Sequence, residues 1–530
     1  MRKILILIPF ILFAGKQIHP DDLIVSWEKR QVVNKVTNTQ SIIGSKIPCE
    51  EGYADGYPCK GVDLLSFLSP QDLGGTDILN DIWGWTDSQT GNEFALVGLL
   101  NGTSFVDVTD PVNPVVLGLL PTHTISSIWR DIKVYNNYAY VVSENAGNHG
   151  VQIFDLTLLR DVTEFTTFSE TSHYDLIGSA HNIFINEKSG FAYVVGVGSA
   201  ATSDKRCNGG SHIMDLSDPV NPVFAGCFAH KGTGRSGTGY SHDIQVVIYG
   251  GPDSDYVGNE IAFSSNETAL SIADVSDKSN PIIISKYDVT NAGSRYIHQG
   301  WLSEDQKYFF VNDELNELRG LDDTQNTLIF DVSDLDNPRL VSIYESTLTT
   351  IDHNNYVVDS LLYQSNYSAG LRILSIRDPL NPGEVAFFDT YPAGDIIDFV
   401  GSWSNYPFFK SRTIVVSSIE GGLFVLKLNN DVDLATKDEI SIPDRFELKQ
   451  NFPNPFNPVT QIQYDLPKSG NVTIKLFNTL GTEVMTLVSE FKTAGTHFVT
   501  LNGTHLPSGI YFYQLRSGDF VKTRKMSLLK

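Results

Sequence analysis

The sequence predicts an all-β protein, a seven-bladed β-propeller followed by a small Ig-like β-sandwich, with six or eight blades as the alternatives. Three observations lead to this prediction. A ten-residue strand-and-turn motif recurs along most of the chain, pairs of short alternating apolar runs precede its copies, and the composition changes after residue 445. A tandem array of four-stranded units is typical of propellers. Short strands separated by turns are typical of a sandwich.

The motif first reads DVTDPVNPVV at residues 107–116. Copies follow as DLSDPVNPVF from Asp215, DVSDKSNPII from Asp274, DVSDLDNPRL from Asp331 and, more loosely, SIRDPLNPGE from Ser375. Asp and Ser or Thr side chains can hydrogen-bond backbone amides in a tight turn, and proline suits the start of an outer strand. We therefore expect a turn between the third and fourth strands of each unit.

Seven third strands are expected, and they end at residues 107, 155, 215, 274, 331, 375 and 427. Two further alternating runs precede them, as in DIKVYNNYAYVVSE, which gives four strands per unit. No run after residue 427 supplies the last unit with an outer strand, whereas GVDLLSFLSP at 61–70 precedes the first unit. We expect this N-terminal strand to close the ring and to remove its exposed edge. The second and sixth copies are degenerate, which leaves six or eight blades open.

The N-terminus has the order of a secretory signal. Arg2 and Lys3 precede an apolar run from Ile4 to Phe13, which is too short to span a bilayer. We expect a signal peptide at 1–15 and an N-terminal extension at 16–60. No later segment reaches a membrane-spanning length, so we expect export without a transmembrane segment.

The four cysteines predict disulfides. An even number suits an oxidising compartment, and four cysteines allow three pairings. The economical choice joins Cys49 to Cys59 and Cys207 to Cys227, which flank a short loop and a repeat turn. Zinc is the competing interpretation, but the spacing C-x2-C and a nearby histidine pair are both missing, so disulfides are favoured.

The charge of the chain excludes one class of partner. The sequence has 38 Lys and Arg residues against 62 Asp and Glu residues, a formal net charge of -24. Such a surface repels nucleic acid and anionic membranes, and it favours cations. We therefore expect no nucleic-acid partner.

The repeats resemble the LVIVD repeat. Together with the segment CEEGYADGYPCKGVDL at 49–64, they resemble the choice-of-anchor B proteins, which are exported bacterial propellers named for interchangeable C-terminal anchors. The resemblance covers roughly residues 45–430 and implies a propeller over 61–428. It implies no reaction, because a fold family of this kind has no established activity to transfer.

A polar, acidic stretch at 429–445 reads as a linker. The segment 446–530 then contains short alternating runs, among them QIQYDL, NVTIKLFN, HFVTLN and GIYFYQLRSG. About seven antiparallel strands in a small sandwich are the physical interpretation.

The details of this tail resemble the type A C-terminal sorting domain of the type IX secretion system. The matching elements are NFPNPFNP at 451–458, KLFNTLGTEV at 475–484, GIYFYQL at 509–515 and the basic end KTRKMSLLK. The resemblance implies that the type IX machinery binds residues 446–530 and exports the chain, which is then secreted or attached to the outer surface. An ordinary Ig-like binding module is the alternative.

A second periodic feature lies at the start of the expected innermost strands. It comprises Arg130-Asp131, His181-Asn182, His242-Asp243, His298-Gln299 and His353-Asn354, with Asp81 and Ser402 at the equivalent points of the first and seventh units. Inner strands of a propeller all run the same way along the channel, so these residues should form a ring at one mouth. Such a ring can hold a divalent cation, donate to an anionic ligand, or act as acid and base.

The favoured alternative for the ring is structural, in which each histidine bonds a backbone carbonyl of the neighbouring blade. A calcium site around Glu50, Glu51, Asp55 and Asp63 is a weaker hypothesis, because the spacing fits no EF-hand and solvated charge explains it.

Common catalytic motifs are missing from the sequence. GYSHD around Ser241 is not G-x-S-x-G, and neither HExxH nor a strand-G-x-G-x-x-G-helix pattern occurs. We therefore expect a binding protein for an extracellular protein, glycan or cation. The alternatives are a hydrolase or lyase that uses the histidine ring with a metal, and a passive component of the envelope.

Overall fold

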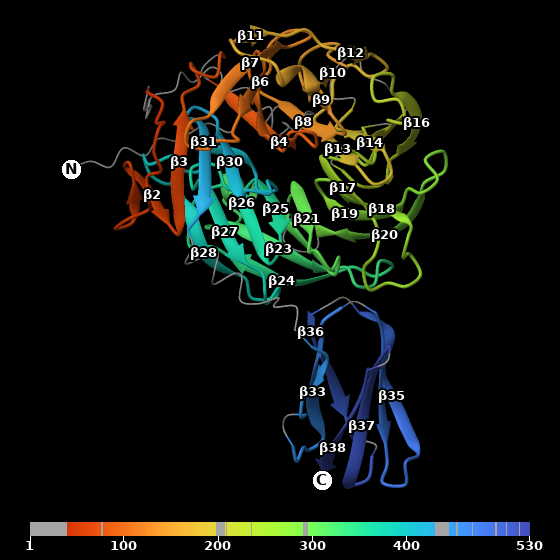
Figure 1. The fold of residues 1–530 in the computed structure, drawn as a ribbon. Helices are drawn as coiled ribbons and strands as arrows, with labels where there is room; N and C mark the ends of the chain where they lie inside the picture. The colour runs from red at the N-terminus through yellow and green to blue at the C-terminus, as the bar shows by residue number, and fades with distance from the viewer. Residues whose placement is uncertain are drawn as a thin grey trace, which may run out of the picture. The chain divides into compact units, whose positions relative to one another are not determined.

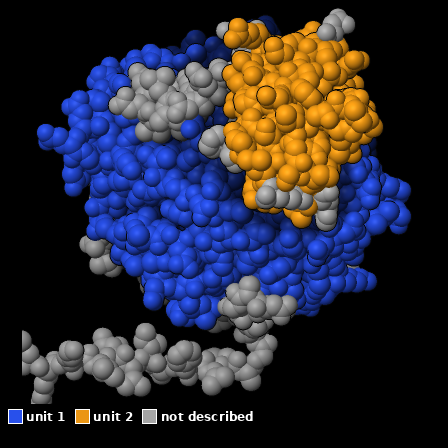
Figure 2. Space-filling view, turned by 90° about the horizontal axis from the view of Figure 1, so that it is seen from below, with its two compact units in different colours: residues 1–432 blue, residues 433–530 orange. Residues whose placement is uncertain are grey.

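The computed structural model describes residues 40–429, apart from 76–77, 198–206, 208, 235 and 290–294, and residues 445–529, apart from 452–453, 469, 493–494, 505 and 519. The chain divides into two compact units, residues 1–432 and 433–530, which Figure 2 colours separately. The expected signal peptide lies outside the described residues, as do most of the expected linker and the first part of the N-terminal extension.

The first unit is a ring of sheets around one axis (Figure 1). Its described residues form seven sheets, and the first strand of each sheet contacts the first strand of the next in a closed cycle. These inner strands are β4 (Leu79–Thr86), β8 (Arg130–Tyr135), β13 (Asn182–Asn186), β17 (Asp243–Ile248), β21 (Gln299–Leu302), β25 (Asn354–Val358) and β29 (Ser402–Tyr406). The predicted β-propeller fold is confirmed.

Each inner strand begins an antiparallel ladder of four strands. The second strands are β5 (Glu93–Leu99), β9 (Tyr138–Ser143), β14 (Phe191–Val195), β18 (Glu260–Ser265), β22 (Tyr308–Asn312), β26 (Leu361–Ser365) and β30 (Thr413–Ser418). The third strands are β6 (Gly102–Asp107), β10 (Val151–Asp155), β15 (Ser211–Asp215), β19 (Ala269–Asp274), β23 (Asn326–Asp331), β27 (Leu371–Ser375) and β31 (Gly422–Leu428). The fourth strands are β7 (Val115–Pro121), β12 (Ser172–Tyr174), β16 (Val223–Phe228), β20 (Ile282–Asp288), β24 (Arg339–Glu345), β28 (Gly383–Phe388) and β3 (Val62–Leu68).

The repeated motif forms the turn between third and fourth strands, as predicted. The carboxylate of Asp107 accepts a hydrogen bond from the amide of Thr109 at 2.9 Å, and the carboxylate of Asp274 accepts one from Ser276 at 2.9 Å. The Thr109 hydroxyl in turn accepts the amide of Glu93 at 3.0 Å. The motif therefore closes the turn and holds it against the start of the second strand.

The same turn also joins neighbouring sheets. Ser66 on β3 donates to the carbonyl of Pro111 at 2.7 Å, and Tyr140 on β9 donates to the carbonyl of Pro219 at 2.8 Å. In both cases a hydroxyl of one sheet bonds a carbonyl in the motif of the next sheet. The repeat therefore recurs because each turn serves both its own sheet and the preceding one.

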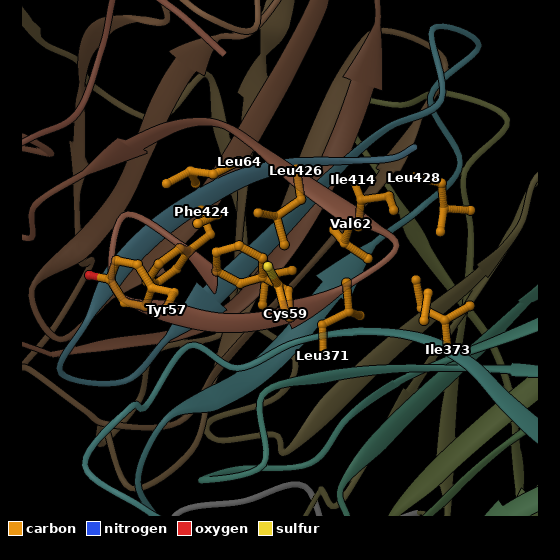
Figure 3. Close-up of a cluster of buried hydrophobic side chains, with 14 of the residues drawn as sticks. Tyr57, Cys59, Val62, Leu64, Leu371, Ile373, Ile414, Phe424, Leu426 and Leu428 are labelled. Carbon is orange, nitrogen blue, oxygen red and sulfur yellow. The ribbon is translucent and has the colours of Figure 1, made fainter. Parts of the chain in front are cut away.

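The N-terminal strand closes the ring. β3 pairs antiparallel with β31 along its length, which confirms the expected closing strand (Figure 1). Figure 3 shows the core at this seam, where Val62 and Leu64 of β3 lie with Phe424 of β31 and with Leu371 and Ile373 of β27. The last sheet thus has a partner for its outer edge, which an open array would expose.

The segment before β3 adds further strand pairing to the propeller. Within it, β1 (Tyr53–Ala54) pairs with β2 (Tyr57–Lys60), and β2 pairs with β28 of the sixth sheet. Cys49 is bonded to Cys59 in this segment, and Cys207 is bonded to Cys227 of β16. Both expected disulfides are confirmed.

The second copy of the motif is degenerate in structure as well as in sequence. A 3-10 turn, η1 (Leu156–Leu159), follows β10 where the other copies have their motif turn. β11 (Thr166–Thr167) then pairs in parallel with β7 of the first sheet before β12 returns to its own sheet. A four-residue helix, α2 (Asn316–Arg319), follows β22. In the described part of the chain, no helix has the length and hydropathy needed to cross a bilayer.

The second unit is an antiparallel β-sandwich of two sheets, as predicted. Its strands are β32 (Glu447–Leu448), β33 (Val459–Leu466), β34 (Gly470–Phe477), β35 (Glu483–Lys492), β36 (Gly495–Asn502), β37 (Gly509–Ser517) and β38 (Phe520–Leu528). One sheet has the order β32-β33-β36 and the other β35-β34-β37-β38. Buried residues of both sheets, such as Ile462 and Tyr513, form one core.

The NFPNPFNP motif fastens the last strand of this sandwich. Phe456 is buried in the core, and its amide donates to the carbonyl of Ser527 at 3.0 Å. The side-chain oxygen of Asn454 accepts the amide of Ser527 at 2.9 Å, while the amide of Asn451 donates to the hydroxyl of Tyr513 at 2.8 Å. The motif therefore packs and hydrogen-bonds against the two C-terminal strands of the chain.

Candidate functional site

The residues expected at the channel mouth gather around one small buried cavity. Ten of the eleven candidates line it: Asp81, Arg130, Asp131, His181, Asn182, Asp243, His298, Gln299, His353 and Asn354. The other, His242, is packed between His181 and His298. Ser402, at the equivalent point of the seventh unit, begins β29 and is buried. The start of each inner strand lies at the same end of the channel, which is why residues far apart in sequence meet here.

Four imidazoles form a continuous arc. The ring centroids of His181 and His242 are 4.1 Å apart, those of His242 and His298 4.3 Å, and those of His298 and His353 4.5 Å. All four side chains are buried. Each histidine directly precedes the residue that begins its inner strand, so successive sheets present their rings side by side.

Hydrogen bonds from Nδ1 orient three of these rings. His298 Nδ1 lies 3.2 Å from the carbonyl oxygen of His353, and His353 Nδ1 lies 2.5 Å from that of Trp403. His181 Nδ1 lies 2.5 Å from the carboxylate of Glu144. A carbonyl oxygen only accepts, so the Nδ1 atoms of His298 and His353 donate and their Nε2 atoms carry the lone pair. These two bonds are the blade-to-blade contacts of the structural interpretation.

Glu314 faces the two lone pairs. Its carboxylate oxygens lie 3.5 Å from His298 Nε2 and 3.8 Å from His353 Nε2. The hydroxyl of Tyr367 donates to the same carboxylate at 2.8 Å. One ligand atom from each of His298, Glu314 and His353 lies within 4.8 Å of the other two. Two imidazoles and a carboxylate are a donor set typical of divalent transition metals.

Glu314 was not among the residues predicted from the sequence, and it lies in the turn after the second strand of its sheet. Its φ is 42°, and Glu267 (φ 59°) and Tyr367 (φ 42°) hold the same left-handed position after β18 and β26. In each case the residue follows a short polar stretch that contains asparagine. That recurrence is the available signal, but the residue itself changes between glutamate and tyrosine.

Burial favours the neutral form of three of the four imidazoles. It lowers the pKa of His298 and of His242 well below the usual value, and it lowers the pKa of His353 to about 3. Neighbouring imidazoles act in the same direction for His242 and His298, because a second positive charge nearby is unfavourable. Neutral imidazole is the form that binds a metal ion.

The carboxylates of the ring already have a cation. Lys133 Nζ lies 2.5 Å from Asp131 and 3.6 Å from Asp81, and 4.4 Å from the centre of the Trp83 ring. Burial raises the pKa of Asp81 well above its usual range and raises that of Asp243 to about 7. Lys133 therefore supplies the positive charge on this side, and the imidazole side is the better metal candidate.

The cavity is small. Its free volume is about 30 Å³, which is roughly the room that one or two water molecules need. Aromatic side chains complete its wall: Trp129, Phe184, Trp301, Tyr356 and Trp403. The His353 ring packs 4.7 Å from Tyr367 and 5.1 Å from Trp403, which belong to a buried apolar cluster. The site has room for an ion or water, not for a sugar or a peptide.

The weaker calcium hypothesis gains no support. Asp63 accepts hydrogen bonds from Lys46 Nζ at 2.9 Å and from the amide of Cys49 at 2.9 Å. Glu50, Glu51 and Asp55 are exposed. Solvated charge explains the three exposed residues, and Asp63 is neutralised by Lys46.

Comparisons with known families identify two parts of the chain. Residues 450–528 match the secretion system C-terminal sorting domain, and residues 129–147 and 261–289 match the LVIVD repeat. No curated protein matches the chain. The sorting domain identifies the protein as secreted or attached to the cell surface, with the type IX machinery as the partner of its tail.

Solved structures with a similar fold are distant in sequence. PorZ of Porphyromonas gingivalis, an essential bacterial surface component of the type IX secretion system, is 12% identical with a TM-score of 0.37, over 83% of this chain and 58% of PorZ. A protein from Lactobacillus plantarum is 12% identical with a TM-score of 0.41, over 79% of this chain and 99% of that one. The periplasmic gluconolactonase PpgL of Pseudomonas aeruginosa is 10% identical with a TM-score of 0.42, again over 79% and 99%.

Proposed function

We propose that this protein is an exported binding protein of the choice-of-anchor B group whose propeller holds a divalent transition-metal ion of the Zn²⁺ class. The proposed ligands are His298 Nε2, His353 Nε2 and the carboxylate of Glu314. Membership of the group is supported by the CEEGYADGYPCKGVDL segment, which carries the Cys49–Cys59 disulfide and the closing strand β3.

One observation carries the metal proposal. The lone pairs of two imidazoles converge on one carboxylate, while the Nδ1 atoms are held by backbone carbonyls. Metal-binding histidines typically donate their second ring N–H to a carbonyl or carboxylate, which fixes the tautomer and the ring plane. The histidine arc therefore combines the structural role favoured by the sequence with a role in binding.

The size of the cavity favours binding over hydrolysis. A free volume of about 30 Å³ admits an ion or one or two water molecules, whereas a hydrolase or lyase must also admit a substrate. The aromatic wall packs directly against His353. A protein or glycan ligand would bind elsewhere on the propeller. The sorting tail would export the propeller in either case.

Metal analysis of the purified full chain tests this proposal. We expect close to one Zn²⁺ per chain after loading with Zn²⁺ and removal of the excess. Glu314→Gln should reduce this content several-fold, because it removes the charged ligand with little change in shape. The double variant of His298→Ala and His353→Ala should abolish it.

A matched control uses the second histidine pair of the propeller. His123, Glu170 and His173 also bring one ligand atom each within 4.8 Å of one another, but His123 is exposed. We expect the double variant of His123→Ala and His173→Ala to keep its zinc content. If zinc is lost in this control and kept in Glu314→Gln, the zinc site lies at His123 and His173, and the assignment to Glu314 is refuted.

A further inference from the structure

Three buried carboxylates meet beside α2, outside the histidine arc. Asp313 follows β22, Glu317 lies in α2, and Asp352 lies two residues before β25 of the next sheet. They are 0%, 3% and 1% exposed. One oxygen from each lies within 4.8 Å of the other two. Side chains of two successive sheets thus bring three acidic groups to one buried point.

Some of these oxygens have partners. Arg295 Nη1 lies 2.6 Å from Asp313 Oδ2 and 2.9 Å from Asp322 Oδ2. Asp352 accepts hydrogen bonds from the amides of Glu314 at 2.8 Å and Asp313 at 3.3 Å. These contacts use one oxygen of Asp313 and hold the Asp352 carboxylate against the turn that leads into α2.

The remaining oxygens lack partners in the described part of the protein. Within the described residues, neither carboxylate oxygen of Glu317 has a hydrogen-bond partner, and Asp313 Oδ1 has none either. The amide oxygen of Asn316, the residue before Glu317, is also buried without a partner. A buried carboxylate that lacks a partner is costly, and proteins compensate for such groups with a cation or a proton.

We propose that Asp313, Glu317 and Asp352 bind a Ca²⁺ ion that fastens the fifth sheet to the sixth. All of the proposed side-chain ligands are oxygens, which suits a hard cation rather than the Zn²⁺ class of the histidine arc. Because the three oxygens lie within 4.8 Å of one another, a point between them lies at most about 2.8 Å from each, which is close to the roughly 2.3–2.6 Å of Ca–O bonds.

The site suits an exported protein. Modules outside the cell bind Ca²⁺ with Kd values of about 10⁻⁴–10⁻³ M, because the ion is abundant there. Mg²⁺ is the less suitable ion, since it keeps several of its waters and demands near-octahedral geometry. The site is 99–100% buried at Asp313 and Asp352, so a smaller ion with a water shell would fit poorly.

Calcium titration of the full chain tests the proposal. The chain is stripped with a chelator at pH 7.5 and studied by calorimetry and thermal unfolding with CaCl₂ or MgCl₂ as the probe. We expect one Ca²⁺ per chain, a Tm that rises with CaCl₂, and a much smaller response to MgCl₂. Glu317→Gln should weaken Ca²⁺ binding at least tenfold, and Asp352→Asn provides a second variant should the first fail to fold.

Two controls separate this site from the others. Asp336→Asn alters an exposed acidic cluster formed with Asp253 and Asp334, and it should leave the calcium response unchanged. Glu314→Gln should also keep the calcium response, while Glu317→Gln should keep the zinc content, so the two metal proposals can fail separately. The proposal is overturned if the stripped chain binds no Ca²⁺, or if binding survives in both Glu317→Gln and Asp352→Asn.

Discussion

A buried carboxyl group can keep a raised pKa even when it accepts backbone hydrogen bonds, and Glu420 shows this. Its two carboxylate oxygens lie 3.0 Å and 3.2 Å from the amide nitrogen of Gly401, and the side chain is 8% exposed. Burial nevertheless raises the pKa of Glu420 to about 7, and Asp398 acts in the same direction. Loss of hydration outweighs one donated amide hydrogen.

This raised pKa predicts a pH-dependent stability. Glu420 binds its proton more tightly in the folded chain than in the unfolded chain, so its contribution is complete below pH 4.5 and is lost as the pH rises to about 7. A shift of this size corresponds to roughly 3 kcal/mol. We expect Glu420→Gln to flatten the fall of the unfolding free energy between pH 4.5 and pH 7, measured by denaturant unfolding.

The control for this experiment is Glu345→Gln, which changes an exposed carboxylate at the end of β24. The free energy of unfolding of this variant should depend on pH as it does in the unchanged chain. If the unfolding free energy falls with pH equally in Glu420→Gln and Glu345→Gln, the pKa of Glu420 does not differ between the folded and unfolded states.

At the scale of elements, the seam between β3 and β31 is the point where the ring can open. Phe424 of β31 is fully buried and its ring lies 4.9 Å from that of Phe67 and 5.1 Å from that of Tyr57. β3 is held by this core, by its pairing with β31, and by isolated backbone bridges to Ile42 and Ile47. Loss of the shared aromatic packing should therefore act first on the closing strand.

We predict that Phe424→Ala destabilises the propeller by about 3–5 kcal/mol and releases β3 before the other strands. Native-state hydrogen exchange measures this, as faster exchange of the β3 amides. Phe105→Ala is the matched control, because Phe105 is equally buried but packs in the core between the first two sheets. Equal protection of β3 in both variants would contradict the seam as the weak point.

The strands were predictable because residues of the repeat mark where strands end and begin. The Asp and Pro of the motif mark the end of the third strand and the start of the fourth, and the apolar run at 61–70 matched the unfilled edge. Glu314 could not be predicted in this way, because turns after second strands differ in sequence and only the fold brings them to the histidines. Glu317 and Asp352 could not be predicted for the same reason, because they belong to two different sheets and only the fold brings them together.

The aromatic side chains that line the cavity also follow a regular spacing in the sequence. Phe184, Trp301 and Tyr356 each follow a ring residue by two positions, so strand alternation turns them toward the same cavity. The candidate ring was identified from its polar members alone, and these aromatic neighbours decide how much space is left. Spacing showed which residues share a layer, whereas the side chains of all inner strands together determine its volume.

At the scale of the whole molecule, the chain consists of two units with separate cores. Among the described residues, the core of the sandwich is formed by residues of the second unit alone. Removal of the sandwich should therefore leave the described propeller folded and change only its destination. This separation makes export testable without loss of the propeller itself.

Deletion of residues 446–530 should leave the chain in the periplasm. The match of residues 450–528 to the sorting domain gives the reason, since the outer-membrane step depends on that tail. Immunoblots of periplasm, cell surface and medium from a host with a type IX system measure the outcome. The trapped propeller should bind zinc as the full chain does, which shows that it is folded. Normal appearance of the truncated chain outside the cell would refute this export route.

A point variant sharpens the same prediction, because it keeps the tail but weakens its fold. Phe456→Ala removes the buried ring of the NFPNPFNP motif, which is 2% exposed, and should cost the sandwich about 3–5 kcal/mol. We expect most of this variant to stay in the periplasm. Leu480→Ala changes a side chain that is 89% exposed in the same unit and should be exported normally. If both variants reach the surface equally, the machinery reads the tail without needing its folded core.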